Sequence, residues 1–230
     1  MKKLFQSIIG LFFPRLCLAC GKSLFDHEEF VCNACWLGMP KTNFHLDPEN
    51  PVAQTFWGRV WLVDAAACFY YIRGNKVQRL IHHLKYKGEE ELGVYLGEYY
   101  GNELLHHDFL TQAEIIVPVP LHPKKLKKRG YNQSESIARG ISRSMGFTVM
   151  TDVLYRTKFT DTQTKKSRFN RWKNVENLFE VNQTDRLQGK HVVVVDDVIT
   201  TGSTIEACVE ALQKVPGIKV SVIALAFSSR

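Results

Sequence analysis

The sequence contains no apolar run of the roughly 20 residues that a helix needs to cross a membrane. Residues 1–14, MKKLFQSIIGLFFP, carry two lysines and then an apolar stretch that Gln6 and Ser7 interrupt. The small-residue cleavage site of a secretory signal peptide does not follow. We therefore expect a short amphipathic helix here, no stable membrane span, and a soluble cytoplasmic protein.

Cysteine is also scarce, with six among 230 residues, and four of these form two CxxC pairs. Eleven residues separate the pair Cys17 and Cys20 from the pair Cys32 and Cys35. Two such pairs can place four thiolates tetrahedrally around Zn²⁺, whereas a redox CxxC favours a βαβ context and disulfides require an oxidising compartment. Because all four ligands are cysteines, no position is open for catalysis, and we expect structural zinc.

Acidic residues are outnumbered, because Lys and Arg total 30 against 23 Asp and Glu, for a formal charge of +7. The basic residues gather in residues 122–129, HPKKLKKR, and in residues 156–173. Such an excess favours anionic partners, either pyrophosphate or nucleic acid, and a solvated basic face gives the same pattern.

The most informative stretch is residues 191–205, HVVVVDDVITTGSTI. The valines at 192–195 indicate a strand that is buried on both faces, because no polar residue marks a wet face. Asp196 and Asp197 end this strand. A hydroxyl-rich loop then opens directly into a helix, and it comprises Thr200, Thr201, Gly202, Ser203 and Thr204.

A loop that enters a helix at its N-terminus is suited to bind phosphate, because the first N–H groups are unpaired and the helix dipole is positive there. Gly202 allows close approach of the backbone, and the hydroxyls can donate further hydrogen bonds. The two carboxylates would repel phosphate, so we expect them to face vicinal sugar hydroxyls or a magnesium ion shared with those hydroxyls. The implied ligand is a phosphorylated ribose. The segment has neither a Walker A lysine nor a GxGxxG motif.

Strands and helices alternate along most of the chain. Apolar β-branched runs predict strands, and apolar residues at helical spacing predict helices. The predicted strands are residues 61–71, 114–120, 148–154, 192–195 and 218–227, with a short apolar run at 178–181. The predicted helices lie around residues 77–84, 92–99, 134–146 and 203–215. This alternation predicts an α/β fold with a doubly wound, mostly parallel sheet.

Two polar segments are expected at ligand-binding positions. Residues 121–133, LHPKKLKKRGYNQ, follow a strand at the carboxyl edge of the sheet, where open α/β folds bind ligands. Ser134 is expected to cap the helix that comes next. Residues 155–177 form a long polar stretch, which indicates either a functional lid or disorder.

The pattern divides the chain into three parts. Residues 1–45 are expected to contain the N-terminal helix and the four-cysteine zinc module. Residues 46–58 contain Pro and Asn without periodicity and are expected to be a linker. Residues 59–230 are expected to form the sheet domain.

Residues 196–204, DDVITTGST, consist of two acids, two spacer residues and Thr-Thr-Gly-Ser-Thr. At every position this segment resembles the phosphoribosyl pyrophosphate signature of the type I phosphoribosyltransferases. Further stretches resemble the ComF family, whose members join an N-terminal zinc module to such a domain. These stretches are LKYKG from Leu84, VPVPL from Val117, RGYNQ from Arg129, and Gln163 with Arg171, Asn174 and Phe179. Because the matching stretches cover nearly the whole chain, the sequence is identified as a member of this family.

The resemblance implies a role for each part of the signature. Thr200 to Thr204 would hold the 5′-phosphate of phosphoribosyl pyrophosphate, and Asp196 and Asp197 would bind its ribose hydroxyls, with Mg²⁺ as the metal. The loop after Pro120 would meet the pyrophosphate group.

Three basic residues are implied as catalytic cations for the departing pyrophosphate, namely Lys85, Arg129 and Arg171. An ordinary role as a surface charge would explain the presence of each residue equally well. The polar stretch at 155–177 would be the lid that excludes water during the reaction. Nothing in the sequence defines the acceptor, whose pocket is expected to be formed by the zinc module and residues 57–71.

Two functions fit this set of features. The first is a magnesium-dependent transferase that moves phosphoribose to an unidentified nitrogen nucleophile. The second is a catalytically silent pocket protein whose basic loops and zinc module bind single-stranded DNA or a DNA-uptake helicase, since the ComF family is associated with competence and DNA uptake. No feature of the sequence indicates an oligomeric state.

Overall fold

The computed structural model describes residues 14–157 and 178–228. The expected N-terminal helix, most of the expected lid, and Arg171 therefore lie outside the described residues. None of the helices in the described ranges combines the length and the apolar character needed to cross a bilayer.

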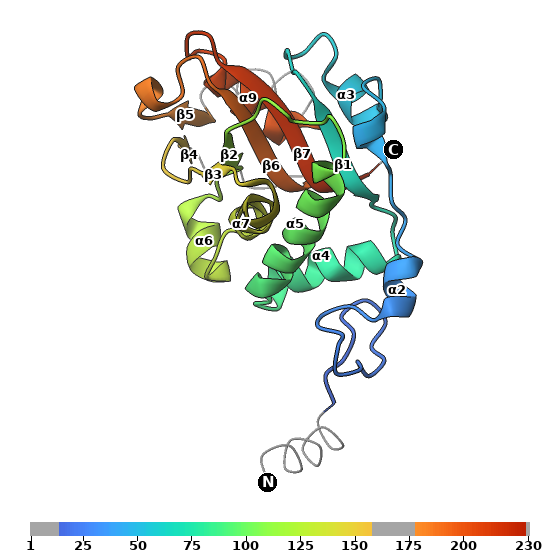
Figure 1. Cartoon of the computed structure of the whole chain (residues 1–230). Helices are drawn as coiled ribbons and strands as arrows, with labels where there is room; N and C mark the ends of the chain where they lie inside the picture. The colour runs from blue at the N-terminus through green and yellow to red at the C-terminus, as the bar shows by residue number, and fades with distance from the viewer. Residues whose placement is uncertain (1–13, 158–177, 229–230) are drawn as a thin grey trace, which may run out of the picture.

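The centre of the fold is a five-stranded parallel sheet with the strand order β1-β7-β6-β2-β3 (Figure 1). Its strands are β1 (Ala65–Tyr70), β7 (Lys219–Phe227), β6 (His191–Ile199), β2 (Ile115–Pro118) and β3 (Thr148–Val149). The four valines of β6 are completely buried, as the apolar run predicted. β6 is longer than predicted, because it continues through both aspartates to Ile199.

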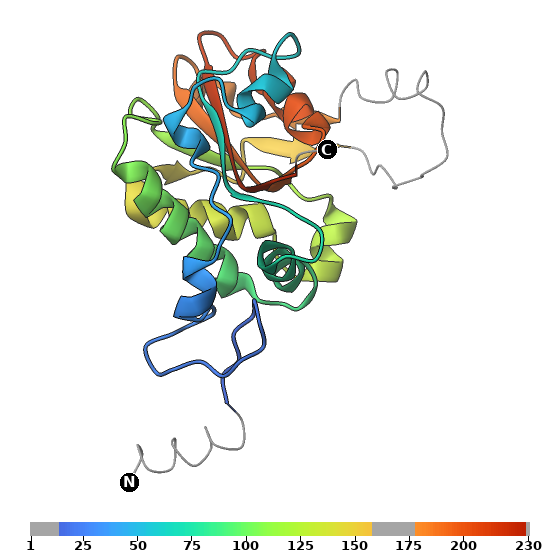
Figure 2. The same cartoon turned by 90° about the vertical axis from the view of Figure 1, so that its right-hand side faces the viewer.

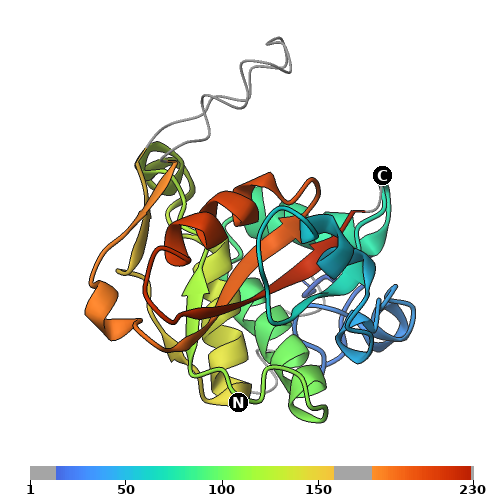
Figure 3. The same ribbon diagram turned by 90° about the horizontal axis from the view of Figure 1, so that it is seen from above.

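Helices cover both faces of this sheet, which confirms the doubly wound α/β fold (Figures 1 and 3). α5 (Glu90–Leu105) and α7 (Gln133–Met145) pack together on one face, and α9 (Ser203–Leu212) lies on the other. Glycines allow the close approach of α5 and α7, because a Cβ at Gly97 or Gly140 would collide with the backbone of the facing helix. α4 (Lys76–Tyr86) precedes α5 and presents Val77, Leu80, Ile81 and Leu84 to the core.

Four sequence-based expectations need correction. Residues 121–133 are not only a loop, because they contain helix α6 (Pro123–Arg129), with Pro123 at its first position and His122 Nδ1 accepting from the Lys124 N–H at 3.1 Å. Residues 148–154 do not form one strand. They divide between β3 and β4 (Leu154–Arg156), and β4 pairs in antiparallel fashion with β5 (Phe179–Val181).

The third correction concerns the start of α7, where Asn132 and not Ser134 is the cap. The Asn132 side chain accepts from the Ser134 N–H at 3.2 Å, which leaves the Ser134 hydroxyl available for another partner. The stop at Gly146 is as predicted, with the left-handed backbone conformation typical of a helix end.

The fourth correction concerns residues 46–58, which are more ordered than a linker. They contain part of a 3-10 helix, η1 (Phe44–Leu46), and helix α3 (Pro51–Phe56), whose Val52 and Phe56 are buried. Asn50 caps α3, and its amide also donates to the Ala65 carbonyl of β1 at 2.7 Å. The proposed boundaries at 45 and 58 remain a prediction, but the segment between them packs on the sheet domain.

The chain also follows the outer edge of β1 before it reaches α3. Lys41 and Phe69 form an antiparallel bridge. The Thr42 N–H donates to the Cys68 carbonyl at 3.0 Å, and the Tyr70 N–H donates to the Pro40 carbonyl at 2.9 Å. Residues 40–42 therefore pair with the edge strand of the sheet.

Candidate functional site

The hydroxyl-rich loop lies where β6 ends and α9 begins, at the carboxyl edge of the sheet. Gly202 is the N-cap of α9 and has a φ of 74°, a conformation that suits glycine. Thr200, Thr201, Ser203 and Thr204 are all exposed, and the Thr201 and Ser203 hydroxyls lie 3.0 Å apart. The loop therefore presents its hydroxyls and the first turn of α9 to solvent, the arrangement that binds a phosphate group.

An arginine that sequence reasoning missed holds this loop against the chain that leads into β1. Arg59 Nη1 donates to the Thr201 carbonyl at 2.9 Å, and the same guanidinium forms an ion pair with Glu206 of α9. The ring of Phe56 lies directly beside Gly202, where an added Cβ would be 2.9 Å from Phe56 Cε1. Because these contacts join residues far apart in the sequence, no local pattern could have indicated them.

The two aspartates differ in their surroundings. Asp197 is 3% exposed, and its Oδ1 lies 2.8 Å from Lys85 Nζ. Asp196 Oδ1 accepts from the Ser134 hydroxyl at 2.9 Å and from the Asp197 N–H at 2.8 Å. Lys85, which the resemblance implied as a catalytic cation, thus forms an ion pair with one of the acids, and Ser134, interpreted from the sequence only as a helix cap, contacts the other.

Burial and the neighbouring carboxylate Asp197 raise the pKa of Asp196 to about 7, against the opposing effect of Lys85. Burial disfavours the charged form of Lys85. Charge attraction and a hydrogen bond to Asp197 together outweigh this effect and raise the pKa of Lys85. Asp197 Oδ2 is buried and has no hydrogen-bond partner among the described residues. The acid pair therefore has both spare negative charge and a spare acceptor atom, which fits a sugar hydroxyl or a divalent cation.

Two further cations lie near the acid pair. Arg129 ends α6, donates to the Gln133 side chain, and places its guanidinium carbon 5.7 Å from the ring centroid of Tyr86 on α4. Arg156 ends β4 and is close enough to Asp196 for attraction to that carboxylate to oppose the lowering of the Arg156 pKa by burial. Arg129 therefore lies close enough to Lys85 for their charges to repel, and its catalytic role stays a prediction. Arg156 is a further cation near the acids, and it precedes the undescribed segment.

The four cysteines of the N-terminal module converge. One ligand atom from each of Cys17, Cys20, Cys32 and Cys35 lies within 4.8 Å of the others. The Cys32 N–H donates to Cys17 Sγ at 3.3 Å, and Cys32 also caps the short helix α2 (Asn33–Leu37). This cluster fits the closed tetrahedral coordination of a structural zinc ion, as the spacing predicted.

The module contacts two helices of the sheet domain (Figure 2). Arg79 on α4 donates to the Ala19 carbonyl, inside the first CxxC pair, at 3.1 Å. Trp36 on α2 donates to the Tyr95 hydroxyl of α5 at 2.8 Å and stacks on Tyr99 with ring centroids 4.4 Å apart. Helix α4 therefore joins the cysteine cluster at Arg79 to the acid pair at Lys85.

The parallel sheet, the acid pair and the loop at the N-terminus of α9 define the class of the molecule. Residues 126–229 match the phosphoribosyl transferase domain family. The domain has the type I phosphoribosyltransferase fold. A solved structure described as the allosteric regulatory enzyme of purine biosynthesis aligns with a TM-score of 0.41 and 17% identity, covering 61% of this chain and 29% of that one.

Two relatives that match beyond this domain family narrow the assignment. The DNA utilization protein YhgH of Escherichia coli K12 is 30% identical over 201 residues, which cover 86% of this chain and 83% of the relative. Competence protein F of Haemophilus influenzae is 34% identical over 118 residues, covering 51% of this chain and 52% of the relative. The chain belongs to the ComF family.

Proposed function

We propose that this chain is a magnesium-dependent phosphoribosyltransferase that moves phosphoribose from phosphoribosyl pyrophosphate to a nitrogen nucleophile. The observation that carries the proposal is the position of Asp196 and Asp197 directly beside an exposed hydroxyl loop at the N-terminus of a helix. A phosphorylated sugar spans these two groups, because its phosphate and its hydroxyls require different partners.

The loop at residues 200–204 would bind the 5′-phosphate through its hydroxyls and the first N–H groups of α9. Asp196 and Asp197 would accept hydrogen bonds from the ribose hydroxyls. The unpartnered Asp197 Oδ2 and the raised pKa of Asp196 also suit Mg²⁺, which would supply positive charge to the pyrophosphate oxygens when bound.

In the reaction, the nitrogen forms a bond to the anomeric carbon of the ribose, and the bond from that carbon to pyrophosphate breaks. The bonding electron pair leaves with pyrophosphate, and the nitrogen gives up a proton. Lys85, which pairs with Asp197, and Arg129, which lies over Tyr86, would stabilise the negative charge that gathers on the leaving group. Arg171 and the lid at 155–177 remain part of the proposal, as the residues that would close over the reacting centre.

A groove of about 380 Å³ along α4 is the proposed acceptor pocket. It shares Lys85 with the acid pair and is also lined by Tyr71, Gln78, Arg79, Ile81, His82, His83 and Tyr86. Rings and hydrogen-bonding side chains of this kind suit a planar nitrogen nucleophile. Of the region expected from the sequence, residues 57–71, only Tyr71 lines this groove.

The decisive measurement is pyrophosphate release from phosphoribosyl pyrophosphate with Mg²⁺ against a panel of bases and amines. The transferase is supported by release that depends on one class of acceptor and on the Asp196 and Asp197 side chains. Binding of phosphoribosyl pyrophosphate without release for any acceptor would instead favour a silent pocket.

A second function is favoured by the exposed basic face of α6. Lys124, Lys125, Lys127 and Lys128 are all exposed there, and Tyr86 is 67% exposed nearby. Basic and aromatic side chains together suit single-stranded DNA, and the names of the relatives refer to DNA utilization and competence. Fluorescence anisotropy with a labelled oligonucleotide would test this function, and the affinity should fall steeply as salt rises. A DNA-uptake helicase as partner and a cytoplasmic location belong to the same proposal.

A further inference from the structure

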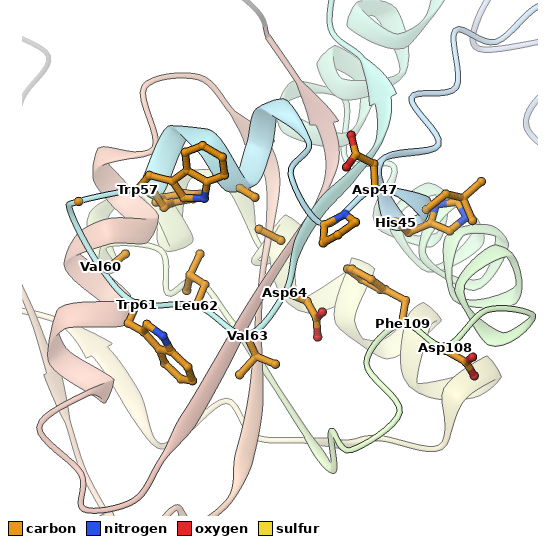
Figure 4. Close-up of a pocket in the computed structure, with 16 residues that line it drawn as sticks. His45, Asp47, Trp57, Val60, Trp61, Leu62, Val63, Asp64, Asp108 and Phe109 are labelled. Carbon is orange, nitrogen blue, oxygen red and sulfur yellow. The ribbon is translucent and has the colours of Figure 1, made fainter.

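A second hollow lies at the amino-terminal end of β1 (Figure 4). Its lining includes Phe56, the residue whose ring lies beside Gly202. Its volume is about 490 Å³, which is the size of a small-molecule site. Three segments form it: the region of η1 at residues 45–48, the chain from α3 into β1 at residues 53–65, and residues 108–109 after α5. In Figure 4, Trp57 and Trp61 lie on one side, Phe109 lies on the other, and Asp64 lies between them.

The lining of this hollow is acidic although the chain as a whole is basic. Asp47, Asp64 and Asp108 line it, and none of the described residues that line it is a lysine or an arginine. These three carboxylates gather in one hollow of a chain whose formal charge is +7. A phosphate or pyrophosphate group would be repelled here, whereas a cation would be attracted.

Hydrogen bonds hold the central carboxylate in place. The Ser221 hydroxyl donates to Asp64 Oδ2 at 3.2 Å and accepts from the Asp64 N–H at 3.1 Å. The same hydroxyl lies 2.8 Å from His191 Nε2, inside the sheet. Burial raises the pKa of the Asp64 carboxyl, which shows that a positive group would be a favourable neighbour for its charged form.

The aromatic wall of the hollow is exposed to an unusual degree. Trp57 is 58% exposed and Trp61 is 63% exposed, although tryptophan is normally well covered in a folded protein. Backbone contacts nevertheless fix their segment, because Gln213 Nε2 donates to the Trp61 carbonyl at 2.5 Å and the Val63 N–H donates to the Val220 carbonyl at 2.8 Å. An indole face attracts an organic cation strongly when the site also removes water from it.

We propose that this hollow binds an organic cation with an aliphatic body, whose ammonium or guanidinium group meets Asp64 and whose body lies against Trp57 and Trp61. A free polyamine and an arginine side chain of a protein share this chemistry. The described lining of the hollow includes neither the acid pair nor residues 200–204, so its occupation does not depend on the transferase proposal.

Isothermal titration calorimetry on the full-length protein at low salt tests this site with three probes. Spermidine represents the free polyamine, N-acetylarginine methylamide represents a protein side chain, and 1,8-octanediol is an apolar control without charge. The wild-type protein should bind at least one of the two cations at a single site, and the diol should not bind. The cation that binds with the higher affinity shows whether the natural ligand is a free polyamine or a protein side chain.

Variants then locate the site. Asp64→Asn should lower the affinity for the cation by about tenfold or more, because it removes a charged hydrogen-bond partner. Trp61→Ala changes an exposed side chain, should leave the fold intact, and should weaken the cation severalfold. Asp185→Asn removes one charge from an exposed position elsewhere and should change nothing.

Two results would overturn the proposal. One is the absence of binding by both cations in the millimolar range. The other is binding that Trp61→Ala leaves unchanged, because the cation would then be attracted elsewhere on the surface. If Asp64→Asn fails to fold, Trp61→Ala alone decides between the outcomes.

Discussion

The candidate site at the end of β6 and the four-cysteine module differ in what holds their side chains in place. Asp196, Asp197 and the loop at 200–204 lie on one strand, loop and helix, and the strand is in the middle of the sheet. Residues 14–38, which contain the four cysteines, have only the five-residue α2 and a single bridge between Leu16 and Ser23 as regular structure. The sheet therefore fixes the site, whereas the module depends on its cysteine cluster.

Cys32→Ser should have the largest effect, and this effect should be confined to the zinc module. Structural zinc contributes roughly 10 to 16 kcal/mol of apparent binding free energy in small finger peptides, so the module should lose its metal and its structure. The sheet domain should stay folded, because its core is formed by other residues. Metal analysis, limited proteolysis and thermal unfolding measure the two parts separately.

The control for this variant is Lys22→Ala, which changes an exposed residue beside the first CxxC pair and should keep about one zinc per chain. A Cys32→Ser protein with full zinc content would contradict the assignment. Loss of phosphoribosyl pyrophosphate binding in a variant whose sheet domain is folded would show that the module also supports the site through α4.

Replacing both Asp196 and Asp197 with asparagine should have the next largest effect, on binding. Hydrogen bonds to charged groups contribute roughly 1.5 to 3 kcal/mol each, so the affinity for phosphoribosyl pyrophosphate should fall by about two to four powers of ten. The fold should persist, with a lowered melting temperature because Lys85 loses its partner. Calorimetry with Mg²⁺ measures the affinity, and Asp185→Asn is the charge-matched control. Undiminished affinity in the double variant would remove the basis of the proposed function.

Gly202→Ala should have a smaller effect, on stability and on the loop. An alanine in the left-handed backbone conformation lowers the free energy of unfolding by about 1 to 2 kcal/mol. The added Cβ would also collide with the Phe56 ring. Gly189→Ala is a matched control, because Gly189 has a φ of 70° but no atom within 4 Å of an added Cβ. Denaturant unfolding should therefore show a larger loss of stability for Gly202→Ala. Equal losses would mean that Phe56 does not support the phosphate loop.

The smallest expected effect is a pH dependence of stability that originates at Asp196. Its pKa is raised from 3.8 to about 7 in the folded protein, so the folded state binds more protons than the unfolded state between these values. The contribution of Asp196 to stability should therefore fall as the pH rises from about 4 to about 7. Asp196→Asn should remove this part of the slope in melting temperature against pH, whereas Asp185→Asn should retain it. An identical slope in wild type and Asp196→Asn would show that the carboxyl titrates normally.

Local sequence signals were sufficient for the centre of the fold. The run at 192–195 predicted β6 because four β-branched residues fit only a strand covered on both faces. The spacing of the four cysteines predicted their cluster, because each CxxC pair brings two ligands together within a few residues. The position of the hydroxyl-rich loop at 200–204, between a strand and a helix, was also predictable, since all its residues are consecutive.

Features that depend on tertiary contacts could not be predicted from the sequence. Ser134 was interpreted as a helix cap because its partner, Asp196, lies on a distant strand. Arg59 gave no signal, and Arg156 was noted only as part of a basic run, since each acquires its role only when folding brings the site residues beside it. Helix α3 escaped prediction because six residues are too few to show a helical period.

The pairing of residues 40–42 with β1 has a consequence for how the molecule meets other copies of itself. An open strand edge is a template for adding a strand from another chain and so for aggregation. Lys41 and its neighbours occupy that edge beside β1, and at the opposite end of the sheet β3 is only two residues long. The sheet therefore offers little unpaired backbone at either end, and we expect any self-association of this protein to use side-chain surfaces instead of strand exchange.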